Sequence, residues 1–392
     1  MSHYPYLVVG GGMAADAAVR GIRELDSQAE IGLIGAEADP PYARPPLSKA
    51  LWKGDPVESV WRKTSEVAAV ELHLGRRATS VDVHRKIVVD DRGASHTFDK
   101  LLLATGGTPR RLSSGGNDVI YFRTLEDYRK LRALAEQHKT FAVIGGGFIG
   151  SEIAAALTLQ GCKVTLIAPG EGIGARLFPP DLAAFLVTYY REKGVDVRSG
   201  QVTHVGRDGS QVVVEAGSGF RVTVDAVVAG IGIVANTELA SAAGLVVDDG
   251  IVVNEHLQTS HGDIFAAGDV ARFEAPALGT RIRVEHEDNA LTMGHAAGRA
   301  MAGDQSPYTH LPSFYSDLFD LGYEAVGAMD PQGETVADWK DAFREGVVYY
   351  LSGGRVRGVL LWNTWGQVDA ARALIAEPGP FNASNLKGRL RG

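Results

Sequence analysis

The chain has 392 residues, of which 45% are hydrophobic and 22% are charged, and its formal net charge at pH 7 is −8. This composition is typical of a globular protein and predicts two or three domains with separate cores. The acidic balance argues against a nucleic-acid-binding or peripheral membrane protein, and no apolar stretch approaches the roughly 20 residues of a membrane span.

The chain begins with a strand–turn–helix pattern. Residues 6–9 form a short apolar run, a glycine triplet follows at 10–12, and small residues recur at helical spacing over about 14–25. An apolar run at 31–34 completes a β–α–β unit, which predicts parallel strands with a right-handed crossover. Because a strand begins within a few residues of the N-terminus, we expect no signal peptide and a cytoplasmic protein.

The same pattern returns in the middle of the chain. An apolar run at 141–144 ends in the glycine triplet 145–147, a helix is expected through Leu159, and a strand follows at 164–168. In such a loop, the first glycine permits a tight turn, the second lets the backbone approach a pyrophosphate, and the third small residue lets the helix pack on the strand. The phosphates then lie at the positive end of the helix. Two loops predict two dinucleotides and a hydride passed between them.

An acidic residue about 20 positions past the glycines takes the ribose hydroxyls in these folds. Glu37, just beyond the strand at 31–34, is the candidate in the first unit. In the second unit, Glu171 either reaches the ribose or is a solvated loop acid. The nearest cation is Arg176, and no arginine pair stands at the strand end to hold a 2′-phosphate. These residues favour NADH over NADPH.

The remaining segments continue the α/β pattern. Strands with turns are expected over 72–90, 100–106, 211–231 and 251–269, and a helix is expected over about 289–301. The tail changes character: strands at 346–351 and 356–362 and a helix near 368–375 predict a small α/β domain.

Cys162 is the single cysteine, and it lies where the first helix of the second unit turns into its next strand. One cysteine excludes an internal disulfide, a CxxC redox pair and a cysteine-based zinc or iron–sulfur site in this chain. We therefore expect a small packed hydrophobic residue, and we predict no metal site.

Several segments in order along nearly the whole chain resemble flavoprotein reductases of the ferredoxin-reductase type, and particularly their apoptosis-inducing-factor branch. The matching segments are PYARPPLSK at 41–49, LATGGTPR at 103–110, the second glycine loop with Ser151 and Glu152, AGD at 267–269, VEH at 284–286 and GVLLWN at 358–363. The resemblance implies two Rossmann-like dinucleotide-binding domains of the glutathione-reductase type and a small C-terminal α+β domain. FAD would be bound by 1–115 and 247–310 and NAD(P)H by 116–246, with 311–392 as an interface domain.

The resemblance also implies a set of site residues. Lys49 and Glu152 would be catalytic: the pair would contact the nicotinamide carboxamide and hold C4 of the nicotinamide near the flavin. A structural alternative for Glu152 is an acid in the first turn of its helix, favoured by the dipole. The cofactor-binding set is Gly10, Gly12, Met13, Ala14, Ala15, Ala36, Glu37, Arg44, Lys49, Ala78, Ala104, Thr105, Gly106, Arg123, Gly145, Gly147, Phe148, Ile149, Gly150, Glu152, Glu171, Gly232, Asp269, Glu285, His286, Glu287 and Tyr315.

The chain departs from the family pattern at several positions, and the departure at Tyr315 concerns the acceptor. Tyr315 stands where many relatives carry tryptophan, and an aromatic residue there either stacks on a ring system or fills a core strand. Ala36 stands where relatives often carry an acid.

The implied activity is hydride transfer from NADH to FAD, followed by electron delivery to a ferredoxin, a rubredoxin or a small oxidant such as a quinone. The competing hypothesis is an NADH-sensing flavoprotein with a long-lived charge-transfer complex and weak oxidase activity. The oligomeric state stays open, with a homodimer as one option.

Overall fold

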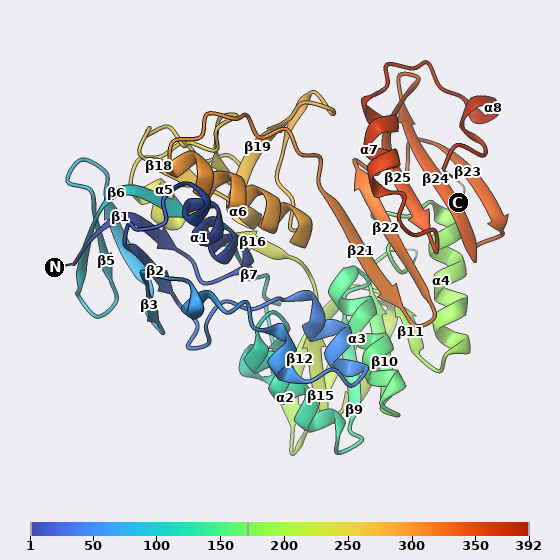
Figure 1. The fold of residues 1–392 in the computed structure, drawn as a ribbon. Coiled ribbons are helices and arrows are strands. Elements are labelled where there is room, and N and C mark those ends of the chain that lie inside the picture. Colours follow the sequence, from blue (N-terminus) through green and yellow to red (C-terminus); the bar gives the residue numbers. More distant parts are fainter. Residues whose placement is uncertain (1, 171, 391–392) are drawn as a thin grey trace. The chain divides into compact units, whose positions relative to one another are not determined.

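The computed structural model describes residues 2–170 and 172–390, and the chain divides into two compact units (Figure 1). The first unit contains the chain up to residue 43 together with residues 57–108 and 234–312. The second contains residues 44–56, 109–233 and the chain from residue 313 onward. The chain passes between the units through short segments that include strands β7 (Gly107–Pro109) and β16 (Ile233–Ala235).

The first unit is built on a mixed sheet with the strand order β3-β2-β1-β6-β5-β4. Strands β1, β2, β3 and β6 are parallel, and β18 adds in parallel to the second half of β6, whose first half pairs with antiparallel β5. The strands are β1 (Ser2–Val9), β2 (Ile31–Gly35), β3 (Val70–Leu74), β4 (Ala78–Asp82), β5 (Ile87–Asp90), β6 (Ser95–Leu103) and β18 (Ile264–Ala266).

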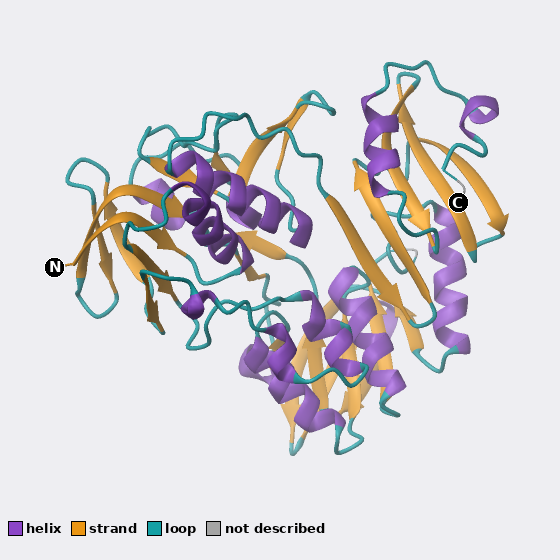
Figure 2. Cartoon of the chain, in the orientation of Figure 1, coloured by secondary structure: helices purple, strands orange, loops and turns teal. Residues whose placement is uncertain are grey.

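Two helices of this unit, α1 (Met13–Leu25) and α6 (Glu287–Met301), cross at very short range. A Cβ at Gly294 would collide with the carbonyl oxygen of Ala14, and one at Gly298 with that of Ala18. Small residues four positions apart on both helices therefore let the two backbones approach closely. Figure 2 shows the two helices crossing in the first unit. The unit is completed by α5 (Glu238–Ala242) and by the small sheet of β17 (Ile251–Val252), β19 (Ala271–Ala275) and β20 (Thr280–Ile282).

The second unit contains a fully parallel sheet with the order β11-β10-β9-β15-β8. Buried strands such as β9 are continuous apolar runs, as expected when both faces of a parallel sheet are covered. The elements are β8 (Val119–Tyr121), α2 (Leu125–Ala135), β9 (Thr140–Ile144), α3 (Phe148–Leu159), β10 (Lys163–Ala168), α4 (Pro180–Glu192), β11 (Asp196–Ser199) and β15 (Ala226–Ala229).

Two antiparallel sheets complete the second unit. The first has three strands, β12 (Val202–Asp208), β13 (Gln211–Ala216) and β14 (Phe220–Val224). The C-terminal sheet has the order β21-β22-β25-β24-β23, and helix α7 (Val368–Ala376) packs on β22 and β25. Its strands are β21 (Ser313–Leu318), β22 (Leu321–Gly327), β23 (Glu334–Asp341), β24 (Glu345–Ser352) and β25 (Arg355–Trp362), and the short helix α8 (Ala383–Leu386) follows.

Both β–α–β units predicted from the glycine loops are confirmed, as β1-α1-β2 and β9-α3-β10. The helices expected near 289–301 and 368–375 are confirmed as α6 and α7, with boundaries that differ by one or two residues. The C-terminal strands and helix form the small α/β domain that the sequence predicted.

Candidate functional sites at the carboxyl ends of two parallel sheets

In the first unit, four parallel strands end at the same level. Val9 is in register with Ile34 and with Leu103, and Leu103 is in register with Ala266. The loops that follow these strands therefore meet at one edge, which is where ligands bind in open α/β sheets. Most of the predicted residues of this unit lie in those loops or in the first turn of the helix that follows: Gly10, Gly12, Met13, Ala14, Ala15, Ala36, Glu37, Ala104, Thr105, Gly106 and Asp269.

The first glycine loop has the geometry of a phosphate cradle. Gly10 has φ +138°, and a Cβ there would collide with the carbonyl oxygen of Ala104. Gly12 is the N-cap of α1, and a Cβ there would meet nothing within 4 Å. The loop thus leaves open space in front of a helix N-terminus, where backbone N–H groups stabilise phosphate oxygens. These residues fit the pyrophosphate of a dinucleotide.

Glu37 follows β2 at the same edge, one residue after the exposed Ala36. Its carboxylate accepts a hydrogen bond of 2.5 Å from the Tyr42 hydroxyl, which holds the side chain in one orientation. A carboxylate beside the glycine loop fits the ribose hydroxyls of an adenosine. Ala78, the first residue of β4, is half-buried in the same unit.

A second group of predicted residues surrounds the beginning of α6. His286 is the N-cap of this helix, so the helix starts at Glu287, two residues earlier than the sequence indicated. Burial lowers the pKa of His286 to about 4, against the opposing charges of Asp269 and Asp288. The ring is therefore neutral at neutral pH. Glu285 accepts from Arg283 at 3.0 Å.

In the second unit, the parallel strands again bring distant loops together. Ile144 is in register with Ile167 and with Ala229, and Ala229 is in register with Tyr121. The residues after these strands include Gly145, Gly147, Phe148, Ile149, Gly150, Gly232 and Arg123. A Cβ at Gly150 would collide with the Gly145 carbonyl oxygen, which explains why this position needs the smallest residue. Glu171, the predicted ribose acid, lies outside the described residues.

The second glycine loop resembles the first in its geometry. Gly145 has φ +108°. Gly147 is the N-cap of α3, and a Cβ at this position would meet nothing within 4 Å. Phe148, the first residue of α3, is exposed, and its ring lies 5.2 Å from that of Phe314 in an edge-on arrangement. The loop fits a second pyrophosphate.

Glu152 is the centre of a buried polar cluster in the second unit. Its side chain is only 2% exposed, and its Oε1 lies 2.7 Å from Nζ of Lys49. The Ser316 hydroxyl donates to the same Oε1 at 2.6 Å, and the Ser48 hydroxyl donates to Oε2 at 2.5 Å. Burying a carboxylate is costly unless it is paired and hydrogen-bonded, and this one is both.

The sequence placed Glu152 in the first turn of its helix, and that prediction is wrong. Helix α3 begins at Phe148, and its first turn contains no acid, so Glu152 belongs to the second turn. There the macrodipole has largely decayed. Its three side-chain partners, rather than the dipole, stabilise the charge.

Lys49 contacts a further predicted residue. Its Nζ lies 5.1 Å from the centroid of the Tyr315 ring, within the range of a cation–π interaction. Tyr315 is 41% exposed and lies on β21, so it is not the buried core residue that the alternative interpretation required. Arg44, five residues before Lys49, donates from Nη1 to the carbonyl oxygen of Arg123 at 2.9 Å.

Sequence reasoning missed three residues of these sites. Ser48 and Ser316 contact Glu152, and Asp16, fully buried in α1, accepts hydrogen bonds from Arg20, Arg62 and Thr64. Ser48 and Ser316 each adjoin a residue that the sequence did single out, Lys49 and Tyr315. Nothing in the spacing of 48, 152 and 316 indicates that the three side chains meet.

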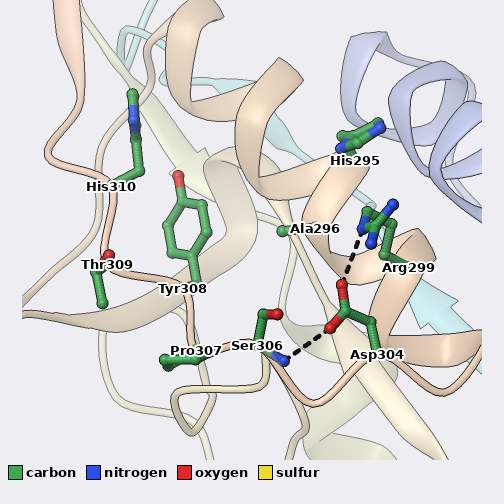
Figure 3. A pocket seen from close by; sticks show the side chains of 9 residues that line it. All are labelled: His295, Ala296, Arg299, Asp304, Ser306, Pro307, Tyr308, Thr309 and His310. Carbon is green, nitrogen blue, oxygen red and sulfur yellow. Dashed lines mark hydrogen bonds and ion pairs between the residues drawn. The ribbon is translucent and has the colours of Figure 1, made fainter.

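A pocket of about 520 Å³ lies elsewhere in the first unit, along the end of α6 (Figure 3). Arg299 in this pocket donates to Asp304 at 2.8 Å and to Glu24 at 2.6 Å, so its charge is already compensated. Among the described residues that line it, none belongs to the predicted site. Within residues 2–170 and 172–390, no helix is long and apolar enough to cross a membrane.

Comparisons with known proteins agree with this geometry. The family model of pyridine nucleotide-disulphide oxidoreductases matches residues 4–294, and that of the apoptosis-inducing factor, mitochondrion-associated C-terminal domain matches residues 297–342. The chain is 35% identical to putidaredoxin reductase of Pseudomonas putida, covering 97% of this chain and 93% of the relative. It is 34% identical to the mitochondrial apoptosis-inducing factor 1 of Dictyostelium discoideum, covering 96% and 79%.

A solved structure supports the same assignment. The reductase in a covalent putidaredoxin reductase–putidaredoxin complex matches with a TM-score of 0.91 at 33% identity, covering 98% of this chain and 96% of that one. The fold predicted from the sequence, two dinucleotide-binding domains with a small C-terminal domain, is confirmed. The chain belongs to the pyridine nucleotide-disulphide oxidoreductase family and is a flavoprotein oxidoreductase of the ferredoxin-reductase and apoptosis-inducing-factor type, which uses FAD and NADH.

Proposed function

We propose that the protein is an NADH-dependent reductase of a ferredoxin-type electron carrier, and that Lys49 and Glu152 orient the nicotinamide for hydride transfer. In this proposal FAD is held by 1–115 and 247–310, NADH by 116–246, and 311–392 is the interface domain. When bound, FAD accepts the hydride and passes electrons on to the acceptor. We also propose that the protein works in the cytoplasm.

The Lys49–Glu152 pair is the observation that carries this proposal. A buried carboxylate supplies a hydrogen-bond acceptor of fixed direction, and a nicotinamide carboxamide supplies an N–H donor. The 2.7 Å contact between Oε1 of Glu152 and Nζ of Lys49 holds the two side chains against each other, and both are largely buried. Such preorganised groups contribute to catalysis by restricting the substrate to a reactive geometry.

The chemistry of the chain and the identity of its relatives favour one class of electron acceptor. With Cys162 as the single cysteine, the chain has no internal dithiol to relay electrons, so the acceptor takes them from the flavin directly. One relative that the chain covers almost from end to end is a putidaredoxin reductase. A protein acceptor of the ferredoxin class therefore fits better than a disulfide substrate.

A second candidate function is NADH sensing, in which reduction by NADH yields a long-lived complex and turnover is slow. The match of residues 297–342 to the C-terminal domain of apoptosis-inducing factors favours it.

Anaerobic reduction by NADH followed by mixing with separate acceptors tests the two candidates. We expect a ferredoxin to reoxidise the reduced protein at least about tenfold faster than air does, with rubredoxin and a quinone as comparison acceptors. A reduced form that persists with every acceptor, with an absorbance band above about 600 nm, would contradict the reductase and support the sensor.

The role of Glu152 is tested by Glu152→Gln, which keeps the size of the side chain and removes its charge. We expect flavin reduction by NADH to slow by one to two powers of ten, which corresponds to about 1.4–2.7 kcal/mol of transition-state stabilisation. Stopped-flow absorbance measures the rate, and the visible spectrum measures retained FAD, which we expect to be unchanged. Glu192→Gln, at an exposed acid of α4, is the control. An unchanged rate in Glu152→Gln would leave Glu152 as a structural partner of Lys49.

A further inference from the structure

The two carboxylate oxygens of Glu152 accept from different numbers of donors. A carboxylate offers about four acceptor positions, two on each oxygen. Oε1 receives both Lys49 and Ser316, whereas the donor on Oε2 is Ser48. The remaining acceptor position is therefore on Oε2, and its direction is set by the place of the Ser48 hydroxyl.

The two serines come from segments that are distant in the chain. Ser48 is the last residue of the short 3₁₀ helix η1 (Pro45–Ser48), whose two prolines restrict the backbone. Ser316 is a fully buried residue of β21. Both hydroxyls are thus held by rigid backbone, while a glutamate side chain by itself has three rotatable bonds.

The aromatic neighbours of the cluster are uncharged. Burial, with the nearby charge of Glu152, raises the pKa of Tyr323 and of Tyr190 well above that of an ordinary tyrosine. Tyr323 faces Ser316 in the strand register, and Tyr190 donates to the Ser151 carbonyl oxygen at 3.1 Å. These phenols stay protonated and present no competing anion to Lys49.

We propose that Ser48 and Ser316 are positioning residues for hydride transfer, which clamp the Glu152 carboxylate so that only Oε2 can accept the carboxamide N–H of the nicotinamide. The proposal rests on the proposed role of Glu152 and deepens it. Loss of either hydroxyl leaves Glu152 paired with Lys49 but less restricted in its rotation, because the carboxylate keeps only two of its three donors. The nicotinamide then still binds, with a smaller fraction of complexes in the reactive geometry.

The test compares Ser48→Ala, Ser316→Ala and the double variant with the wild-type holoenzyme. Stopped-flow reduction gives the limiting rate at saturating NADH and the half-saturating concentration separately. We expect the limiting rate to fall about tenfold in each single variant and further in the double variant, with the half-saturating concentration within about twofold. Ser48→Thr and Ser316→Thr, which keep a hydroxyl, should recover at least half of the lost rate on a logarithmic scale.

Two readouts do not depend on turnover. Titration calorimetry with NAD⁺ should give an affinity within about twofold of wild type, and crystal structures of the alanine variants should show the Glu152 carboxylate rotated from its wild-type place. Thr158→Val is the matched control: its hydroxyl lies on the same helix α3 and donates to the Ala154 carbonyl oxygen at 2.7 Å, away from Glu152. It should match wild type in every measurement.

The proposal is overturned if both alanine variants keep a limiting rate within twofold of wild type, or if the rate loss tracks a loss of NAD⁺ affinity. It is also overturned if Glu152 keeps its place in the variant structures. Failure of the underlying function has a different signature: Glu152→Gln itself would then leave the limiting rate unchanged.

Discussion

At the scale of single residues, each of the two helices that follow a glycine loop carries a buried carboxylate, Asp16 in α1 and Glu152 in α3. Asp16 has no exposed side-chain surface, yet it lies in the first turn of α1, directly after the first glycine loop. Arg20 donates to both of its oxygens at 3.0 Å, Arg62 at 2.9 Å and Thr64 at 2.8 Å. The cluster ties the helix that faces the phosphate site to the segment around residue 62.

We expect Asp16→Asn to lower the free energy of unfolding by about 2–3 kcal/mol, because two guanidinium groups lose a charged partner. This loss of stability is smaller than that expected for a fully buried ion pair, because the side chains of Arg20 and Arg62 are partly exposed to solvent. Chemical denaturation followed by circular dichroism measures it. Asp369→Asn is the control: Asp369 is 95% exposed and bonds Arg372 at 2.8 Å, so we expect a change below about 0.5 kcal/mol. Equal losses in the two variants would contradict the argument.

Cys162 belongs to a reactive residue type, but its surroundings make the thiol unreactive. Burial raises the pKa of its thiol, and Sγ lies 3.6 Å from the Ala135 carbonyl oxygen. We expect Cys162→Ser and wild type each to take up two electrons per FAD in an anaerobic NADH titration. Extra electrons accepted by the wild type alone would reveal a thiol redox centre.

At the scale of elements, the crossing of α1 and α6 fixes the geometry of the first unit. Helix α1 begins at the glycine loop, and α6 begins beside His286, so one contact positions both helix N-termini. The contact depends on backbones that approach closely enough for Gly298 to face the Ala18 carbonyl oxygen.

We expect Gly298→Ala to destabilise the protein by about 1–3 kcal/mol, because the added methyl group overpacks this contact. In a helix without such a neighbour, the same substitution would raise the free energy of unfolding by roughly 1 kcal/mol. The sign of the change in stability therefore distinguishes the two cases. Gly262→Ala is the control, because Gly262 lies in a loop of the same unit and a Cβ there would meet nothing within 4 Å. Thermal unfolding measures both, and a stabilised Gly298→Ala would mean that the helices separate easily.

At the scale of the whole molecule, partly buried histidines contribute to the response of stability to acid. Burial lowers the pKa of His73, and it lowers the pKa of His286 to about 4. Both rings stay neutral in the folded chain at a pH at which the unfolded chain takes up protons. Their contribution to stability is therefore complete above the ordinary histidine pKa of about 6.5 and is lost as the pH falls from there toward the folded values.

We expect the unfolding temperature to fall between about pH 7 and pH 5, with a shallower fall in His73→Gln. Differential scanning calorimetry at both values measures it. The carboxylate of Asp263 does not account for a loss in this window, because hydrogen bonds from Lys100 and Lys86 lower its pKa to about 2, and its stabilisation is lost only below about pH 4. A flat profile over the same range would contradict the prediction.

The sequence by itself determined what local chain geometry dictates. A glycine triplet between an apolar run and small residues permits few structures other than a strand, a tight turn and a helix, so both phosphate loops and the helices α1 and α3 followed from it. The place of Glu37 was predictable for the same reason, since it comes just after β2, the strand that pairs with the strand before the glycine loop. The single cysteine likewise limited the redox chemistry, because an internal dithiol needs two thiols.

Only the tertiary structure decided how distant segments meet. Glu152 was expected at the positive end of its helix, but it lies one turn further on, and its charge is stabilised by side chains near residues 48 and 316. Serine is common on surfaces and in turns, so neither Ser48 nor Ser316 carries a local signal of its role. Asp16 was missed because its burial depends on hydrogen bonds from Arg62 and Thr64, which are distant in the chain. No periodicity or spacing in the sequence indicates those contacts.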